Sequence, residues 1–284
     1  MPELPEVETI RRQLDPQLQA AEIIDADAHW SEKFTPALDA IGSTITGIDR
    51  RGKYLLFDLV TSESPGPDVP HLELVAHLGM TGSFHIEPAR TDTNGRKVSD
   101  YGPHCRAVWT LDDGRRLRFD DTRRFGRLRV VEQGQYGDIP TLAQMGPEPF
   151  DPAFTGASLH AYVKRTNRAI KTQLLSQRPV AGVGNIYADE ALFLAGIHPK
   201  SKRVGRERCD RLVETIRQVL RAGIDNGGTT LRDYVDAQGD AGTNQLSLVA
   251  YGRSGEPCVE CGSELRSTVI DARTTTYCIA CQRS

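Results

Sequence analysis

The apolar residues near the start of the chain recur at helical spacing. Val7, Ile10, Leu14 and Leu18 lie three or four residues apart, so they form one face of an amphipathic helix over residues 3–18. Pro16 could end this helix early, because proline removes a backbone donor. The chain is therefore expected to begin with a helix that buries one side.

From residue 19 to residue 132 the pattern changes to short apolar runs separated by turns. Residues 53–59 and 72–76 are typical strand runs, and Asp113-Gly114 stands between two more and indicates a hairpin. This part is expected to form a mostly antiparallel sandwich or barrel that follows the N-terminal helix. Exposed loops are expected at residues 62–70 and 87–103.

The helical period returns after a stiff, proline-rich turn at residues 146–152. Residues 155–178, 185–196 and 209–224 are predicted to be helices, and glycines stand where the last two should stop. Residues 227–250 are rich in glycine and threonine and are expected to form a long loop. The length of 284 residues suggests two domains.

Charge is distributed unevenly in a chain whose net charge is −3. Residues 1–70 carry 6 Lys and Arg against 13 Asp and Glu, whereas residues 164–232 carry 14 against 6. An overall positive field is thus excluded as the basis of nucleic-acid binding, but a local field is not. An arginine-rich solvated helix face would give the same numbers. The sequence contains no run of about 18 apolar residues, so no membrane span is expected. The acidic N-terminus does not resemble a secretory signal.

Four of the six cysteines form two closely spaced pairs near the C-terminus. In a chain without a secretion signal, two C-x-x-C pairs indicate a zinc site, although a redox or disulfide role would use the same residues. Four thiolates fill the coordination shell of zinc, so one structural metal ion is expected. The predicted ligands are Cys258, Cys261, Cys278 and Cys281.

The N-terminus offers a second candidate for chemistry. A small residue after Met1 permits removal of the methionine, which leaves Pro2 with a free secondary amine. A chain α-amine has a pKa of about 8, so a neutral fraction can attack a carbonyl-like carbon and form an imine. Glu3 and Glu6 lie beside it as proton donors or acceptors. A helix-start proline with two glutamates favoured by the helix dipole is the simpler interpretation.

Two further groups of residues suit the recognition of DNA. Met80 stands at a glycine-flanked turn, and Arg123, Arg124 and Phe125 share another, as in proteins that wedge into a base stack while gripping phosphates. The second group surrounds a turn before a helix, where backbone N–H groups and the Asn185 amide could cradle phosphate. Positive charge could be added there by Lys171 and by the neighbouring Lys164, Arg165 and Arg168. Methionine and phenylalanine are often core residues, and glycine often precedes a helix, so each group alone is also explained by an ordinary structural role.

Together these motifs resemble the bacterial formamidopyrimidine-DNA glycosylase family. The resemblance runs in order from residue 2 to residue 282. It is carried by Pro2-Glu3-Leu4-Pro5-Glu6-Val7-Glu8, Arg51-Gly52-Lys53-Tyr54, His77-Leu78-Gly79-Met80, Arg123-Arg124-Phe125-Gly126, Gly184-Asn185-Ile186-Tyr187-Ala188-Asp189-Glu190, Gly227-Gly228-Thr229-Thr230-Leu231, Tyr251-Gly252-Arg253 and the two cysteine pairs.

The resemblance implies an α+β multidomain fold. The expected parts are a catalytic two-sheet β-sandwich with an N-terminal helix at 1–140, a hinge at 141–154, a helix–two-turn–helix domain with a lesion-recognition loop at 155–250, and a zinc finger at 251–284. DNA would bind in the cleft between the domains. A monomer in the bacterial cytoplasm, associated with the nucleoid through DNA, is the expected working form.

The implied activity is that of a bifunctional glycosylase and lyase in base excision repair. A damaged purine, such as 8-oxoguanine or a formamidopyrimidine, is flipped out of the duplex. Pro2 attacks C1′, expels the base and forms a Schiff base, and β,δ-elimination then cuts the strand. Glu3 would move protons, with Glu6 nearby, and Lys53 and Arg273 would assist. The expected DNA contacts are Met80, His104, Arg123, Arg124, Phe125, Lys171, Asn185 and Tyr251.

Two departures from the family pattern stand out. The first is His104-Cys105-Arg106 in place of the family's His-x-His motif, a replacement that keeps a positive contact but changes its type. The second is the segment 242–250, which lacks aromatic residues. The altered loop makes lesion preference the open point. One alternative is an endonuclease VIII-like enzyme for oxidised pyrimidines, although such chains begin Pro-Glu-Gly-Pro, whereas Leu4 stands here. Another is an inactive damaged-DNA-binding protein, which would have altered Pro2, Glu3 or Lys53.

Overall fold

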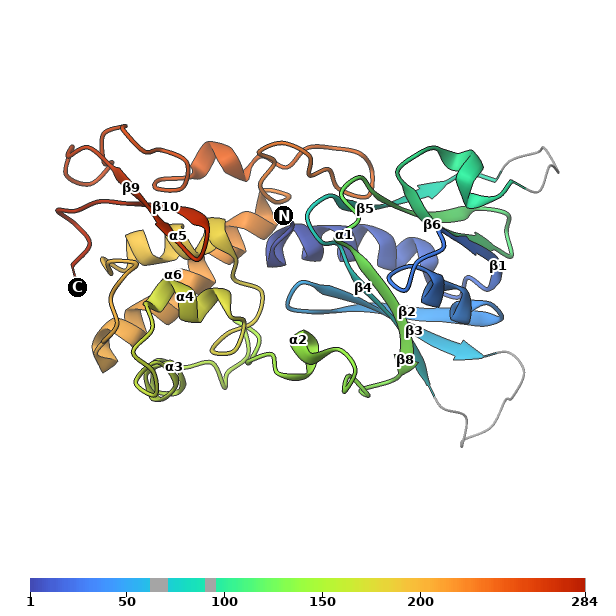
Figure 1. The fold of residues 1–284 in the computed structure, drawn as a ribbon, viewed down its shortest axis with the longest axis horizontal. Helices are drawn as coiled ribbons and strands as arrows, with labels where there is room; N and C mark the ends of the chain where they lie inside the picture. The colour runs from blue at the N-terminus through green and yellow to red at the C-terminus, as the bar shows by residue number, and fades with distance from the viewer. Residues whose placement is uncertain (62–70, 90–95, 284) are drawn as a thin grey trace. The chain divides into compact units, whose positions relative to one another are not determined.

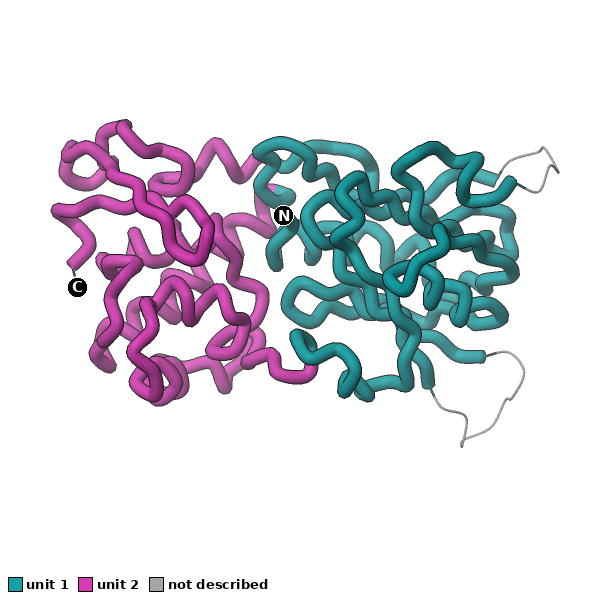
Figure 2. The backbone as a smooth tube through the Cα atoms, in the orientation of Figure 1, with its two compact units in different colours: residues 1–142, 227–242 teal, residues 143–226, 243–284 magenta. Residues whose placement is uncertain are grey.

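The computed structural model describes residues 1–61, 71–89 and 96–283. The loop expected at 62–70 and part of that expected at 87–103 lie outside this range. The chain forms two compact units (Figure 2). Unit 1 comprises residues 1–142 and 227–242, and unit 2 comprises residues 143–226 and 243–284.

Unit 1 begins with helix α1 (Leu4–Leu18), followed by two antiparallel sheets (Figure 1). Among the described residues, one sheet has the strand order β1-β6-β7-β5 and the other the order β2-β3-β4-β8. The predicted two-sheet sandwich with an N-terminal helix is confirmed. The strands are β1 (Ile23–Ala28), β2 (Ser43–Arg51), β3 (Tyr54–Thr61), β4 (Leu72–His77), β5 (Gly82–Glu87), β6 (Cys105–Leu111), β7 (Arg116–Asp121) and β8 (Arg127–Glu132).

The core of unit 1 lies between the two sheets and the apolar side of α1. Val7, Ile10, Leu14 and Leu18 are fully buried there, as the spacing predicts. Pro16 lies inside the last turn of α1 and does not shorten it. Phe84 is at the centre of an aromatic cluster, in contact with Phe57, Trp109 and Phe119. Short helices η1 (Thr35–Ala40), η2 (Val98–Tyr101) and α2 (Pro140–Ala143) complete the described connections.

The segment 227–242 packs on α1, although the sequence suggested grouping it with the helices that precede it. The Gln13 side chain donates to Asp236 Oδ2 at 2.6 Å and accepts from the Ala237 N–H at 2.9 Å. Asp236 and Ala237 are 223 and 224 residues from Gln13 along the chain, so local sequence carries no sign of these contacts.

Unit 2 is helical and ends in a hairpin. Residues 155–178, predicted as one helix, form two, because the N–H groups of Ile170 and Lys171 donate to Ser201 O and Pro199 O instead of to the preceding turn. The elements are α3 (Gly156–Val163), α4 (Ile170–Leu175), α5 (Asn185–Leu194), α6 (Arg206–Asp225), η3 (Asn244–Ser247), β9 (Arg266–Ile270) and β10 (Arg273–Tyr277). Within the described ranges, no helix is long and apolar enough to cross a membrane.

Candidate active site and zinc centre

The start of α1 is closed by its own glutamates. Glu3 is the N-cap residue, and its N–H donates to Glu6 Oε2 at 2.8 Å, while its carboxylate accepts from the backbone of the first turn. Glu3 and Glu6 are each only 2% exposed, and Pro2 is buried beside them. Pro2, Glu3 and Glu6, which the sequence singled out, therefore form one ordered group.

A glycine loop from the 227–242 segment completes this group. The Thr229 N–H donates to Glu6 Oε1 at 2.7 Å, so Glu6 connects the start of α1 to residues far along the chain. Gly228 has a φ of +89°, and a Cβ there would lie 2.9 Å from Glu6 Cγ and from Tyr234 Cε1. Only glycine fits this approach at position 228.

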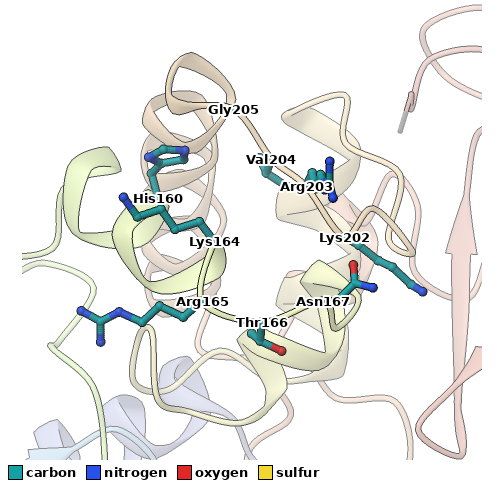
Figure 3. A pocket seen from close by; sticks show the side chains of 9 residues that line it. All are labelled: His160, Lys164, Arg165, Thr166, Asn167, Lys202, Arg203, Val204 and Gly205. Carbon is teal, nitrogen blue, oxygen red and sulfur yellow. The ribbon is translucent and has the colours of Figure 1, made fainter.

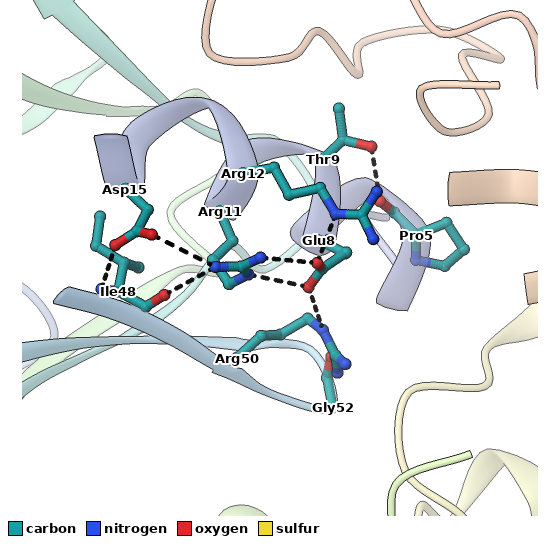
Figure 4. Close-up of polar contacts among 9 residues, drawn as sticks. All are labelled: Pro5, Glu8, Thr9, Arg11, Arg12, Asp15, Ile48, Arg50 and Gly52. Atoms are coloured by element: carbon teal, nitrogen blue, oxygen red, sulfur yellow. Dashed lines mark hydrogen bonds and ion pairs between the residues drawn. The ribbon is translucent and has the colours of Figure 1, made fainter. Parts of the chain in front are cut away.

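Glu8 joins α1 to the turn that precedes Lys53 (Figure 4). Its carboxylate forms ion pairs with Arg11 and Arg12 of the same helix, and with Arg50 Nε of β2 at 3.0 Å. The Arg50 guanidinium also donates to Gly52 O at 3.1 Å, one residue before the buried Lys53. Glu8 and Arg50 thus hold the Lys53 turn against the helix that carries Pro2 and Glu3.

Glu8 should make unfolding sensitive to acid. Burial raises the pKa of its carboxyl, but the bonds from Arg11 and Arg12 and the charge of Arg50 outweigh burial and lower this pKa from 4.5 to about 2. A lowered folded-state pKa gives stability that is present above pH 4.5 and lost as the pH falls toward 2. The shift corresponds to about 3 kcal/mol at neutral pH.

Glu8→Gln should therefore lower the free energy of unfolding by about that amount at pH 7. The difference from the unmodified protein should shrink below pH 4.5, as denaturant unfolding at several pH values would show. The exposed Glu32→Gln is the matched control and should change little. A Glu8→Gln difference that stayed constant down to pH 3 would contradict the ion-pair explanation.

His77 is a member of this site that the sequence identified only as part of a motif. Its ring lies 4.7 Å from the Tyr54 ring, and Nδ1 accepts from the Gly79 N–H at 3.2 Å. Burial, with the charges of Lys53 and Arg127, lowers the pKa of His77 to about 4. The ring is thus neutral at pH 7, and Nε2 is left as its N–H donor.

The turns that carry Met80 and Phe125 touch one another. A Cβ on Gly79 would lie 2.5 Å from the Phe125 carbonyl carbon. The Asp121 carboxylate holds both turns, because it accepts from Thr81 Oγ1 at 2.6 Å and from the Gly126 N–H at 2.7 Å.

The three predicted wedge residues on these turns are exposed. They are Met80, Arg123 and Phe125, the last of which is 49% exposed. The Arg123 guanidinium lies 4.8 Å from the centre of the Phe125 ring. The structure therefore brings the three predicted wedge residues together, with exposed Arg124 beside them.

His104 and Arg106 are placed differently from one another. His104 is exposed and lines a cavity with Thr81 and Arg123. Arg106 is only 2% exposed, and its Nε donates to Asp121 O at 2.8 Å. The expectation that Arg106 keeps a positive DNA contact is wrong, because its guanidinium is used inside the protein.

In unit 2, Asn185 and Arg273 lie on elements that are bonded together. Asn185 begins α5, and its Nδ2 donates to Thr274 O at 3.2 Å, next to the exposed Arg273 at the start of β10. The turn before Arg273 has Asp271 and Ala272 with positive φ angles of 49° and 58°. This two-residue turn directs the Arg273 end of the hairpin.

Lys171 is not available to phosphate in this structure. It is fully buried, and its Nζ donates to Asp189 Oδ1 at 2.5 Å and to Thr275 Oγ1 at 2.8 Å. Asp189 Oδ2 in turn accepts from the Thr276 N–H at 3.0 Å. Lys171 therefore ties α4 to α5 and β10, which revises the expectation that it adds charge to a binding surface.

Glu190 fixes the end of the predicted lesion-recognition loop, a role that its place in the Gly184–Glu190 motif did not indicate. Its carboxylate accepts from the N–H groups of Val249, Ala250 and Tyr251 at 2.7–2.9 Å. Leu246, in the same segment, is 84% exposed. The part of 242–250 that lacks aromatic residues thus presents one apolar side chain from an anchored loop.

The four cysteines of the two pairs converge as predicted. All four Sγ atoms lie within 4.8 Å of one another, with Cys258–Cys281 at 3.9 Å and Cys261–Cys278 at 3.5 Å. Tetrahedral zinc with Zn–S bonds of 2.3 Å requires sulfur atoms about 3.8 Å apart. The cluster therefore fits one structural zinc ion. The cysteine pairs share a small buried cluster with Phe193, Ala250 and Leu265, too small to fold a hairpin alone.

Removal of the metal should disorder the hairpin that carries Arg273. Freshly purified protein is expected to contain about one equivalent of zinc. Chelation, or Cys278→Ser, should abolish measurable DNA affinity while unit 1 keeps its strand signal in circular dichroism. Cys209→Ser, which alters a buried cysteine of α6 outside the cluster, is the control for a general thiol effect. Full affinity in zinc-free protein would contradict a structural role for the metal.

Comparison with known protein families gives three matches along the chain. Residues 1–128 match the formamidopyrimidine-DNA glycosylase N-terminal domain, and residues 145–235 match the formamidopyrimidine-DNA glycosylase H2TH domain. Residues 255–283 match a zinc finger found in FPG and IleRS.

Relatives that carry this family name are similar over the whole chain. The formamidopyrimidine-DNA glycosylase of Deinococcus radiodurans is 42% identical over 99% of this chain and 97% of its own. The crystal structure of the MutM (Fpg) protein of Thermus thermophilus, at 41% identity, superposes with a TM-score of 0.86 over 99% of this chain and 98% of that one. Lactococcus lactis Fpg bound to DNA containing an abasic site, at 32% identity, gives 0.82 over 99% and 100%.

Proposed function

Since this chain belongs to the formamidopyrimidine-DNA glycosylase family and is a base excision repair glycosylase for oxidised purines, we propose that Pro2 is its nucleophile. The proposal rests on the buried start of α1, where Glu6 is bonded both to the Glu3 N–H and to the Thr229 N–H. Such a network orders the backbone next to Pro2, and a nucleophile requires a fixed position.

The reaction follows from an amine placed in this way. Once Met1 is removed, the neutral Pro2 nitrogen attacks C1′ of the damaged nucleotide, the base leaves, and an iminium forms. Glu3 protonates the sugar ring oxygen or moves protons in the later steps, with Glu6 as its partner. Lys53 and Arg273 bind phosphates beside the lesion and assist the two eliminations that cut the strand. Lyase activity of this kind is typical of the family.

The DNA contacts are carried over from the family resemblance, and the exposure of Met80, His104, Arg123, Arg124 and Phe125 supports them. Met80, Arg123 and Phe125 fill the space left by the flipped nucleotide, with Arg123 facing the orphaned base. His104, Arg124, Asn185 and Tyr251 bind the backbone. The solved complexes of Lactococcus lactis Fpg with Fapy-dG and with abasic-site DNA support double-stranded damaged DNA as the partner. We further propose that the protein acts as a monomer in the bacterial cytoplasm.

Borohydride trapping tests the nucleophile and the lesion class together. A duplex with 8-oxoguanine opposite cytosine should give a covalent adduct that peptide mapping places on Pro2. Matched duplexes with an oxidised pyrimidine or an abasic site are the controls. Trapping with the pyrimidine duplex alone would favour an endonuclease VIII-like enzyme, and absence of any adduct with zinc-loaded protein lacking Met1 would favour a binding protein.

A further inference from the structure

A basic cavity in unit 2 is not used by the proposed reaction. It has a volume of about 710 Å³ and is framed by the end of α3 with the following loop, and by the loop before α6 (Figure 3). Its lining contains no carboxylate. The lining residues are His160, Lys164, Arg165, Thr166, Asn167, Lys202, Arg203, Val204 and Gly205.

The charge around this cavity is not neutralised by the protein. Lys164, Arg165, Lys202 and Arg203 are exposed, and within the described ranges none of them takes part in an ion pair. The nearby acids of α6 already have partners, because Asp210 pairs with Arg206 and Glu207 with Arg211. Four exposed cations without an ion-pair partner around one cavity give it a local positive field, which attracts anions although the net charge of the protein is −3.

Helix α6 adds to this field. It is 20 residues long, begins at the cavity with Gly205 as its N-cap, and has no side-chain cap there. The N–H groups of such a helix start carry partial positive charge, which favours phosphate. Figure 3 shows Arg165 and Lys202 extending outward on opposite sides of the cavity, so their charges flank its opening.

The cavity is built on the elements that hold the proposed phosphate ligands. Its two loops are bonded to each other where the Ile170 N–H donates to Ser201 O at 2.7 Å. The next residue, Lys171, bonds to Asp189 of α5 and Thr275 of β10, and Lys200 Nζ bonds to Thr268 of β9 at 2.7 Å. The basic residues are therefore fixed to the same helices and hairpin as Asn185 and Arg273.

We propose that this cavity binds backbone phosphates of the bound duplex beyond those that flank the lesion. It is an auxiliary site that increases affinity for long DNA and has no role in base excision. The proposal rests on the DNA-binding function above. The group that the cavity recognises is phosphate, which could come from the DNA backbone or from free inorganic phosphate. The experiment below distinguishes these two sources.

The test compares two duplexes that carry the same abasic-site analogue, one of about 12 and one of about 35 base pairs, or roughly one and three helical turns. For the long duplex, Lys202→Gln/Arg203→Gln and Lys164→Gln/Arg165→Gln should each lower the slope of log affinity against log salt by about one to two. Affinity for the short duplex should remain unchanged, and so should single-turnover excision from a short duplex of the same sequence that carries 8-oxoguanine.

Arg206→Gln/Arg211→Gln is the matched control, because it removes the same charge from exposed, ion-paired residues of α6. Unchanged slopes on long DNA for both cavity pairs would overturn the proposal, as would equal losses on both duplexes. Heat stabilisation by inorganic phosphate that depends on the cavity residues, without any dependence on duplex length, would overturn it too. Failure of the unmodified protein to excise 8-oxoguanine from the matched duplex would instead count against the catalytic assignment, and the binding comparison would still decide the role of the cavity.

Discussion

Protein that retains Met1 is expected to give no covalent adduct with lesion DNA under borohydride. It should also cut that DNA at least about a thousandfold more slowly than the processed chain. The reason is chemical, because the nitrogen of Pro2 is an amide when Met1 is attached and has no basic lone pair for attack at C1′. The measurement pairs the intact mass of each preparation with its trapping yield on an 8-oxoguanine duplex.

The same preparation supplies its own control. Treatment with a methionine aminopeptidase should restore both the adduct and the cutting rate, without any change in fold. Binding of an abasic-analogue duplex should differ much less between the two forms than catalysis does. Equal trapping yields from chains with and without Met1 would rule out Pro2 and direct attention to a lysine such as Lys53.

Lys171→Met is expected to destabilise unit 2 by about 3–5 kcal/mol, because it leaves Asp189 buried without its cation. Burial already raises the pKa of Asp189 to about 6, even with Lys171 beside it. The fully buried Lys171 also loses its bond to Thr275 in this variant, so β10 should separate from α5. Denaturant unfolding measures the loss, and hydrogen exchange in β10 locates it.

A double replacement separates the two possible roles of Lys171. Lys171→Met with Asp189→Leu removes both buried charges and should recover most of the stability. If Lys171 only positions β10, the stable double variant should regain most of its DNA affinity. If Lys171 contacts phosphate directly, the double variant would fold well and still bind lesion DNA weakly, which would contradict the positioning role.

The parts of the site that could be predicted from the sequence have local signals. The spacing of Cys258, Cys261, Cys278 and Cys281 specifies a tetrahedral thiolate site almost without knowledge of the fold. The antiparallel strands of unit 1 followed from short apolar runs and turns, which left a sandwich or a barrel open until the family resemblance implied two sheets. The period of Val7 to Leu18 predicted α1. Glycine-flanked turns likewise marked the positions of Met80 and Phe125.

The remaining features depend on contacts between distant residues. Lys171 and Arg106 look like surface cations in the sequence, yet one pairs with Asp189 and the other with the carbonyl of Asp121. Glu190 appears as one more helix residue, although its carboxylate holds three N–H groups some sixty residues away. Long-range partners of this kind are decided by packing, which charge and periodicity do not encode.

The packing of residues 227–242 on α1 has a consequence for synthesis. Because a chain is made from its N-terminus, Pro2 and Glu3 leave the ribosome first, but Thr229, which holds Glu6, follows only after α3 to α6 have been made. A nascent chain that has just completed both sheets therefore lacks the segment that orders its catalytic end. We expect incomplete chains to carry the nucleophile in an unorganised form, so that strand cutting begins only when translation is nearly finished.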